Sequence, residues 1–313
     1  MSAVRVRVPA KVNLQLGVGP IRDDGYHDLV NVFHAVSLFD EVTAEPAPRL
    51  EVRVQAAPHA RVEIGGVPTG DDNLAAKAAR LVADRLGVEP RVALGIRKAI
   101  PVAGGMAGGS ADAAAALVAC ARLWDERERP VLSRDDLMEI GADLGSDVPF
   151  AVLGGTAVGV GRGERLTPAL ARGTFHWVFA TADGGLSTPA VYGECDRLRL
   201  EAGWTATPLQ AEPAVSEALM TALATGDAKA LGAALSNDLQ PAALSLRPSL
   251  RRTLDAGHDL GAIGALVSGS GPTCAFLAES AEDAADLADA LHGAGVAEQI
   301  VRASGPVPGA TVM

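Results

Sequence analysis

Residues 101 to 116 read Pro-Val-Ala-Gly-Gly-Met-Ala-Gly-Gly-Ser-Ala-Asp-Ala-Ala-Ala-Ala, and this stretch decides much of the fold. Two glycine pairs leave its first half almost bare of side chains. Its alanine-rich second half has high helix propensity, and Ser110 is a suitable residue to cap that helix. A bare loop that leads into a helix gathers unpaired N–H groups at the positive end of the helix dipole. Such a loop suits a phosphate group.

The glycine spacing matches neither of the two commonest phosphate-binding fingerprints. The segment lacks the Gly-Lys-Ser/Thr ending of a P-loop, and its glycines do not fall at G-x-G-x-x-G spacing. A tight turn before a buried helix is the alternative, although a turn needs only one or two glycines. The two glycine pairs therefore favour a phosphate cradle over a simple turn.

The N-terminal half predicts strands around the glycine segment. Residues 4 to 16 alternate between apolar and mostly polar positions, which is typical of a half-buried strand, or of two strands broken at Pro9. Lys11 and Asn13 then share one face, about 6–7 Å apart. Further strands are expected at 30–43, 50–54 and 92–98, and helices after Asn73 and after Ser133, the latter opening with a capping box to Asp136.

The C-terminal half mixes strands and helices without regular alternation, which favours an α+β fold over a doubly wound sheet. The expected segments are strands at 176–181, 263–267 and 274–278, helices at about 213–224, 227–235, 247–257 and 281–293, a loop at 201–212 and a loose tail at 304–313. Glycines punctuate residues 154 to 163. We therefore expect two domains, residues 1–160 and 161–313.

Composition excludes several classes of protein. The net charge is −11 and no basic stripe is present, which argues against nucleic acid as a partner. No apolar run approaches the roughly 18 residues that span a bilayer, so no membrane partner is expected. The three cysteines are far apart and odd in number, which points to a reducing, cytoplasmic setting. The six histidines show no metal-ligand spacing.

Asp147 is the most informative single carboxylate. It lies in Gly145-Ser-Asp-Val-Pro-Phe150, and because Val148 precedes proline, we expect Asp147 at a corner between a helix and a strand. Its neighbours are apolar, so an unpaired carboxylate there would be costly, and Lys11 is the obvious counter-ion. The alternative is that Asp147 merely caps a helix end.

Two weaker signals accompany this pair. Val267-Ser-Gly-Ser-Gly-Pro-Thr273 is a second glycine loop, which either turns N–H groups toward an anion or simply connects two strands. Tyr26 and His27 follow a turn and offer either a stacking surface or a packed loop. Two glycine loops with a lysine–carboxylate pair and no metal cage together suit phosphoryl transfer, in which the protein positions a nucleotide and an alcohol.

The motifs resemble those of the GHMP kinases over nearly the whole chain. The matching segments are Pro9-Ala-Lys-Val-Asn-Leu14, Asp24-Gly-Tyr-His27, 101–114, Gly145-Ser-Asp-Val-Pro-Phe150 and Ser268-Gly-Ser-Gly-Pro272. The resemblance implies an S5-like N-terminal domain and a ferredoxin-like C-terminal domain. Two of the segments, Ala10-Lys-Val-Asn-Leu14 and Gly25-Tyr-His27, resemble the branch that phosphorylates the 2-hydroxyl of a diphosphocytidyl alcohol in non-mevalonate isoprenoid synthesis.

The resemblance also implies roles for particular residues. Asp147 would be the base, with Lys11 beside it. ATP would lie on Asn73, Lys98, Pro101, Gly104, Gly105, Ala107, Gly108, Gly109, Ser110 and Asp112. The alcohol would lie on Asn13, Tyr26, His27, Thr188, Tyr192, Ser270 and Gly271. Mg²⁺ would be held mainly by the ATP phosphates, with Ser110.

These roles imply small-molecule partners for a monomer or weak homodimer. Two alternatives remain: another small-alcohol GHMP kinase, of the mevalonate or homoserine type, or a nucleotide-binding protein without turnover.

Overall fold

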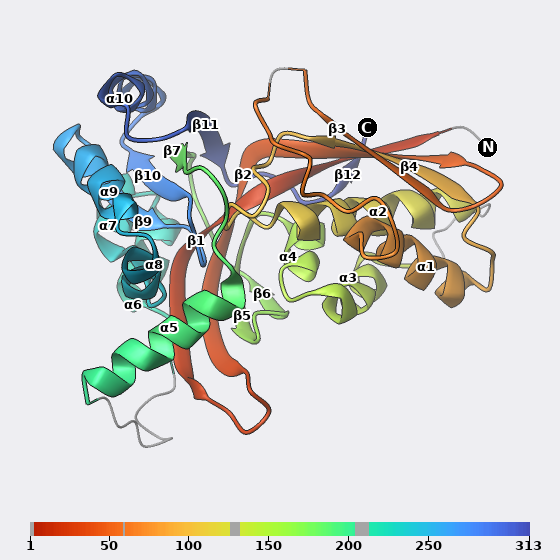
Figure 1. Cartoon of the computed structure of the whole chain (residues 1–313), viewed down its shortest axis with the longest axis horizontal. Coiled ribbons are helices and arrows are strands. Elements are labelled where there is room, and N and C mark those ends of the chain that lie inside the picture. The colour runs from red at the N-terminus through yellow and green to blue at the C-terminus, as the bar shows by residue number, and fades with distance from the viewer. Residues whose placement is uncertain (1–2, 59, 126–131, 204–212) are drawn as a thin grey trace.

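The computed structural model describes residues 3–58, 60–125, 132–203 and 213–313, and it is built around two sheets (Figure 1). The first sheet contains β1 (Val4–Ile21), β2 (His27–Pro46), β3 (Glu51–Ala56), β4 (Val92–Lys98), β5 (Thr156–Gly161), β6 (Arg165–Pro168), β8 (Ser236–Asn237) and β12 (Thr311–Val312). The second contains β7 (Phe175–Thr181), β9 (Gly264–Val267), β10 (Cys274–Ala278) and β11 (Gln299–Gly305). The α+β prediction is confirmed.

The two sheets differ in connectivity. The eight-stranded sheet runs β12-β1-β2-β4-β3, with β5 and β6 branching from β2 and β8 pairing with β1 in parallel. The four-stranded sheet runs β11-β7-β10-β9 and is antiparallel throughout. The predicted domain boundary falls at the end of β5, and β6 continues the first sheet to Pro168.

The helices fall into two groups in Figure 1. The group against the first sheet comprises α1 (Leu74–Leu86), α2 (Gly108–Trp124), α3 (Arg134–Leu144) and α4 (Val148–Leu153). The group on the C-terminal side comprises α5 (Thr188–Glu201), α6 (Glu217–Thr225), α7 (Ala228–Ala234), α8 (Gln240–Leu246), α9 (Ser249–Asp259) and α10 (Ala281–Ala294). No helix in the described part of the chain is both long and apolar enough to cross a bilayer.

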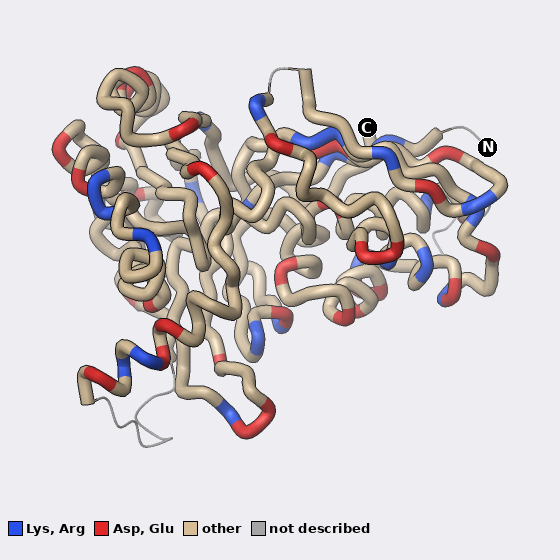
Figure 2. The backbone as a smooth tube through the Cα atoms, in the orientation of Figure 1, with Lys and Arg blue, Asp and Glu red and all other residues tan. Residues whose placement is uncertain are grey.

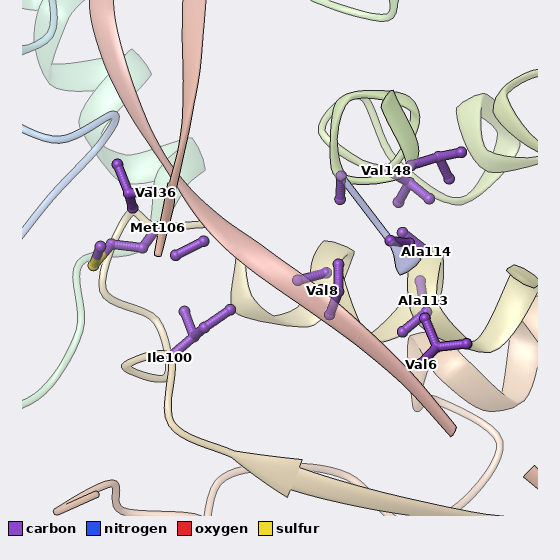
Figure 3. Close-up of a cluster of buried hydrophobic side chains, with 14 of the residues drawn as sticks. Val6, Val8, Val36, Ile100, Met106, Ala113, Ala114 and Val148 are labelled. Carbon is purple, nitrogen blue, oxygen red and sulfur yellow. The ribbon is translucent and has the colours of Figure 1, made fainter. Parts of the chain in front are cut away.

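Part of the main hydrophobic core forms where α2 packs on β1. Val6 and Val8 of β1 lie close to Ala113 and Ala114 of α2, and all four side chains are buried (Figure 3). The alanines of α2 let its backbone approach the sheet closely, because each places only a methyl group between the helix and the strands. This packing fixes the start of α2, and with it the end of the glycine segment.

Two expectations about the chain ends were wrong. The alternation at residues 4–16 predicts a half-buried strand, but β1 is buried on both faces from Val8 to Val18, because the C-terminal elements cover its second face. The tail after residue 304 is not loose: Val312 pairs with Val6. Of the predicted 201–212 loop, residues 204–212 lie outside the described residues.

His34 lies in the interior where the two sheets meet. Its side chain is fully buried on β2, and Nδ1 is 2.8 Å from the hydroxyl of Thr156. A Cβ added to Gly305 of β11 would lie 2.5 Å from Nε2, so that glycine permits the close approach. Burial lowers the pKa of His34 to about 4, and the ring is therefore neutral in the folded protein at neutral pH.

We expect this histidine to make folding acid-sensitive. Its folded-state pKa lies below the ordinary value of 6.5, so the unfolded chain binds the extra proton. Above pH 6.5 the ring is neutral in both states, and His34 causes no loss of stability. As the pH falls toward 4, the unfolded state binds the proton first and the free energy of unfolding decreases. Between pH 7 and pH 5 the loss is about 2 kcal/mol.

The test is urea unfolding of the wild type and His34→Gln at both pH values. The wild type should lose about 2 kcal/mol more than the variant over this interval. Equal losses would show that another group causes the acid sensitivity.

Candidate active site

The two glycine loops meet between the two sheets and line one cleft of ≈ 800 Å³. The hydroxyl of Ser268 donates to the carbonyl of Gly105 at 3.1 Å. Gly105 has a φ of 76°, and a Cβ there would lie 2.2 Å from the Ser268 carbonyl oxygen. Only glycine therefore lets the first loop pack on the second.

A substitution at this contact tests the arrangement. Gly105→Ala should lower the free energy of unfolding by about 2–4 kcal/mol, since a left-handed conformation and a backbone clash add together. Gly87→Ala is the matched control, because Gly87 also has a positive φ, of 69°, but nothing lies within 4 Å of its added Cβ. The control should lose about 1 kcal/mol. Equal losses in urea unfolding would contradict the loop contact.

Helix α2 begins without a side-chain cap. Ala107, at φ 60°, occupies the capping position, and the first intrahelical bond runs from Ala111 N–H to the Ala107 carbonyl at 2.8 Å. The expectation that Ser110 caps the helix was wrong: Ser110 is in the first turn and lines the cleft. The amide groups of Gly108 and Gly109 precede that first bond and line the cleft too. A helix start of this kind suits an anion.

Lys11 and Asp147 face each other across the cleft floor. The ammonium nitrogen lies 3.8 Å from the nearer carboxylate oxygen and donates to Asn13 Oδ1 at 2.6 Å. Asn13 in turn donates to Asn31 at 2.7 Å. Burial lowers the pKa of Lys11, and the Asp147 carboxylate raises it in part. The Lys11 side chain is buried, whereas that of Asp147 is 31% exposed and accessible from the cleft.

The backbone around Asp147 differs from the expectation. Asp147 precedes a helix, α4, and Pro149 lies in the first turn of that helix. The predicted helix-to-strand corner was therefore wrong, because proline is tolerated where the first N–H groups need no helical partner. Asp147 caps nothing with its side chain. Its carboxylate therefore has no capping role, and it lines the cleft beside Lys11.

Aromatic side chains also line the cleft. His27 stacks on Tyr192 with ring centroids 5.2 Å apart. His27 Nδ1 lies 2.9 Å from the carbonyl oxygen of Gly19, which only accepts, so Nδ1 carries the proton. Nε2 faces Asp196 at 3.4 Å. Burial, and secondarily the charge of Asp147, raise the pKa of the Tyr192 phenol, so it stays protonated.

Most of the predicted site residues meet in this cleft. They are Lys11, Asn13, Tyr26, His27, Gly104, Gly105, Ala107, Gly108, Gly109, Ser110, Asp147, Thr188, Tyr192, Ser270 and Gly271. The Thr188 and Ser270 hydroxyls are 3.0 Å apart and join α5 to the second loop.

Four predicted nucleotide-binding residues do not line the cleft: Asn73, Lys98, Pro101 and Asp112. Asn73 caps α1 by accepting from Ala75 N–H at 2.8 Å, and it is buried. Lys98 is buried between Asp40 and Asp112, with 2.7 Å to the latter. Burial raises the pKa of Asp112 well above its usual value against the pull of Lys98, and Asp40 adds to the rise.

The sequence missed several residues that line the cleft. Asn31, Ser146, Arg162 and Asp196 all do so. Asp196 follows Tyr192 by one helical turn of α5, and that i, i+4 spacing is the signal that was available. Ser146 precedes Asp147 in the segment already singled out, whereas Arg162 is brought there by the pairing of β5 with β2.

The described residues hold no cluster of three or more His, Cys, Asp or Glu side chains for a metal ion. Charged residues of both signs are distributed along the chain (Figure 2), with Lys and Arg interspersed among Asp and Glu. The site offers backbone amides, the buried Lys11 ammonium and the Asp147 carboxylate beside it. That set can hold a phosphorylated donor and orient an acceptor hydroxyl.

A cradle of this kind beside a lysine–aspartate pair defines a small-molecule kinase. The family described as "GHMP kinases N terminal domain" matches residues 73–155, and "GHMP kinases C terminal" matches residues 219–297. The proteins of Thermobifida fusca and Nocardia farcinica named 4-diphosphocytidyl-2-C-methyl-D-erythritol kinase are 58% and 57% identical. Each match covers 100% of this chain, and 99% and 97% of the relative. The chain belongs to the GHMP kinases, among the 4-diphosphocytidyl-2-C-methyl-D-erythritol kinases.

Solved structures agree with this placement. A crystal structure of 4-(cytidine 5'-diphospho)-2C-methyl-D-erythritol kinase superposes with a TM-score of 0.73 at 32% identity, covering 96% of this chain and 98% of that one. Homoserine kinase from Cytophaga hutchinsonii superposes with a TM-score of 0.70 at 17% identity, covering 100% and 98%. The second likeness concerns the fold alone.

Proposed function

We propose that this chain transfers the γ-phosphoryl group of ATP to the 2-hydroxyl of 4-diphosphocytidyl-2-C-methyl-D-erythritol. The observation that carries the proposal is the Lys11–Asp147 pair, 3.8 Å apart, in a cleft lined by both glycine loops. The full-length identity to kinases of that name supports the choice of acceptor.

Asp147 acts as the base in this proposal. Its carboxylate accepts the proton of the acceptor hydroxyl as the oxygen bonds to the γ-phosphorus. The bond from that phosphorus to the bridging oxygen breaks, and ADP leaves with the electron pair. Proton transfer comes late, since transition states of this type are loose. Lys11 pairs with the Asp147 carboxylate at 3.8 Å and offsets charge on the transferring group.

The nucleotide phosphates lie on the first loop and the start of α2. The amide groups of Gly108, Gly109 and Ser110 are the donors, at the positive end of a 17-residue helix. Mg²⁺ fits the donor set at the cleft, because Ser110 offers an oxygen ligand and the phosphates offer the others. When bound, the ion neutralises charge on the phosphates. Asn73, Lys98, Pro101 and Asp112 stay predictions as nucleotide contacts.

The cytidine end of the alcohol lies among the aromatic side chains. Tyr26 is 54% exposed and offers an open ring face, and Tyr192 is held by His27. We place the base between the two tyrosines. Asn13, Thr188, Ser270 and Gly271 line the same cleft as the tyrosines and Asp147.

The test is incubation with ATP, Mg²⁺ and the diphosphocytidyl alcohol, followed by phosphorus NMR. A new phosphate ester and stoichiometric ADP are expected, with CMP as a competitive inhibitor. Phosphorylation of mevalonate or homoserine with indifference to CMP would favour another small-alcohol kinase. ATP binding without ADP release in the presence of any of the three alcohols would indicate a nucleotide-binding protein without turnover.

We also place the protein in the cytoplasm, as a monomer or weak homodimer with small-molecule partners. Cys120, Cys195 and Cys274 are buried and free, as a reducing compartment favours. Light scattering during size-exclusion chromatography measures the oligomeric state.

A further inference from the structure

Arg162 lies in the turn between β5 and β6, and it lines the cleft. Gly161 and Gly163 on either side adopt φ values of 77° and 103°, and Arg162 N–H donates to the Glu164 carboxylate at 2.7 Å. A Cβ on Gly163 would lie 4.0 Å from the Ser146 Cβ, so the turn sits next to the segment that carries Asp147. Arg162 lines the cleft, whereas Glu164, the other long side chain of the turn, does not and accepts from the Arg162 amide.

The guanidinium group of Arg162 lies over an aromatic ring of the cleft, that of Tyr26. Its central carbon lies 5.5 Å from the centroid of the Tyr26 ring. A cation placed there is attracted to the ring face and holds the ring in place. One face of Tyr26 is used in this contact, which leaves the opposite face for a planar base.

The charges of the cleft leave Arg162 available to an anion. Within the described chain, Lys11 and Arg162 are the lysine and arginine residues that line the cleft. Lys11 faces Asp147, and the other lining carboxylate, Asp196, faces His27. Arg162 has no carboxylate within salt-bridge distance among the residues described.

We propose that Arg162 binds the diphosphate of the cytidine diphosphate alcohol and braces Tyr26 against the base; this rests on the proposed function. The diphosphate of such a substrate lies between its base and its reacting hydroxyl. Arg162 occupies the matching place, because it contacts Tyr26 and its turn touches the Asp147 segment. Guanidinium suits two phosphate oxygens at once, and its flat face suits the ring.

The test compares three variants. Arg162→Gln should raise KM for the diphosphocytidyl alcohol about 10-fold or more and leave KM for ATP within about twofold. Arg162→Lys keeps the charge but loses the paired hydrogen bonds. Its KM for the diphosphocytidyl alcohol should therefore fall between those of the wild type and Arg162→Gln. Arg165→Gln is the matched control, since Arg165 is exposed on the same hairpin and does not line the cleft. It should behave as the wild type.

Calorimetric binding of CDP and of cytidine separates the two parts of the proposal. Arg162→Gln should weaken CDP about 10-fold or more and cytidine much less. Equal losses would overturn diphosphate binding, because Arg162 would then act only through Tyr26. Unchanged or tighter CDP binding would also overturn it.

The outcomes distinguish this proposal from the proposed function. Turnover of the alcohol by the wild type with unchanged Arg162→Gln kinetics overturns the role of Arg162 alone. CDP binding that depends on Arg162, without turnover of the alcohol, overturns the proposed function alone.

Discussion

Asp147→Asn is expected to lower kcat by about 100-fold or more, with little change in KM for ATP. The amide keeps the size of the side chain but accepts no proton, and a positioned base contributes rate on this scale. The carboxylate is 3.8 Å from Lys11 and 31% exposed, so it is both paired and accessible to a substrate. Steady-state ADP release with the diphosphocytidyl alcohol measures the effect.

Two controls separate the chemistry from folding. Asp143→Asn, four residues earlier and exposed on α3, removes a charge from the same segment and should leave kcat unchanged. The Lys11→Met/Asp147→Asn double variant should lose much less than the product of the single losses, because the two groups act in one step. A folded Asp147→Asn protein with near-wild-type turnover would remove Asp147 from the mechanism.

Features set by local chemistry could be predicted from the sequence. The helices predicted after Asn73 and Ser133 are present, and the capping box of Ser133 and Asp136 opens the second of them. The shared face of Lys11 and Asn13 follows from strand parity, and the two side chains are hydrogen-bonded. Such features depend on neighbours a few residues away, which a single sequence displays.

Features set by distant contacts could not be predicted. Arg162 reaches the cleft because β5 pairs with β2, and no spacing in the sequence relates it to Tyr26. The C-terminal tail lacks an alternating pattern, yet Val312 pairs with Val6 because the edge of β1 is open to it. The register shifts within β1 also depend on its long partner β2. These arrangements come from the packing of segments far apart in the chain.

Lys98 shows how a correct motif match can still leave the role of a residue open. The resemblance places it near the adenosine, whereas the structure buries its ammonium group, with 1% of the residue exposed. Asp40, 58 residues earlier, accepts from Lys98 and from the backbone N–H of Ile100 at 2.9 Å. Lys98 also donates to the Gly108 carbonyl at 3.2 Å. The buried group therefore ties both ends of the glycine segment together.

Lys98→Met should consequently lower the free energy of unfolding by about 3–5 kcal/mol, because it leaves Asp40 and Asp112 buried without their cation. Burial lowers the pKa of Lys98, but the two carboxylates outweigh it and the net shift is upward, so the lysine is charged in the folded protein. Lys229→Met is the control: its pair with Glu279 is exposed, and its loss should cost less than about 1 kcal/mol. Urea unfolding at neutral pH measures both. A Lys98→Met protein of normal stability with a raised KM for ATP would instead assign Lys98 to the nucleotide, since a tie between the two ends of the cradle cannot be lost without a cost in folding.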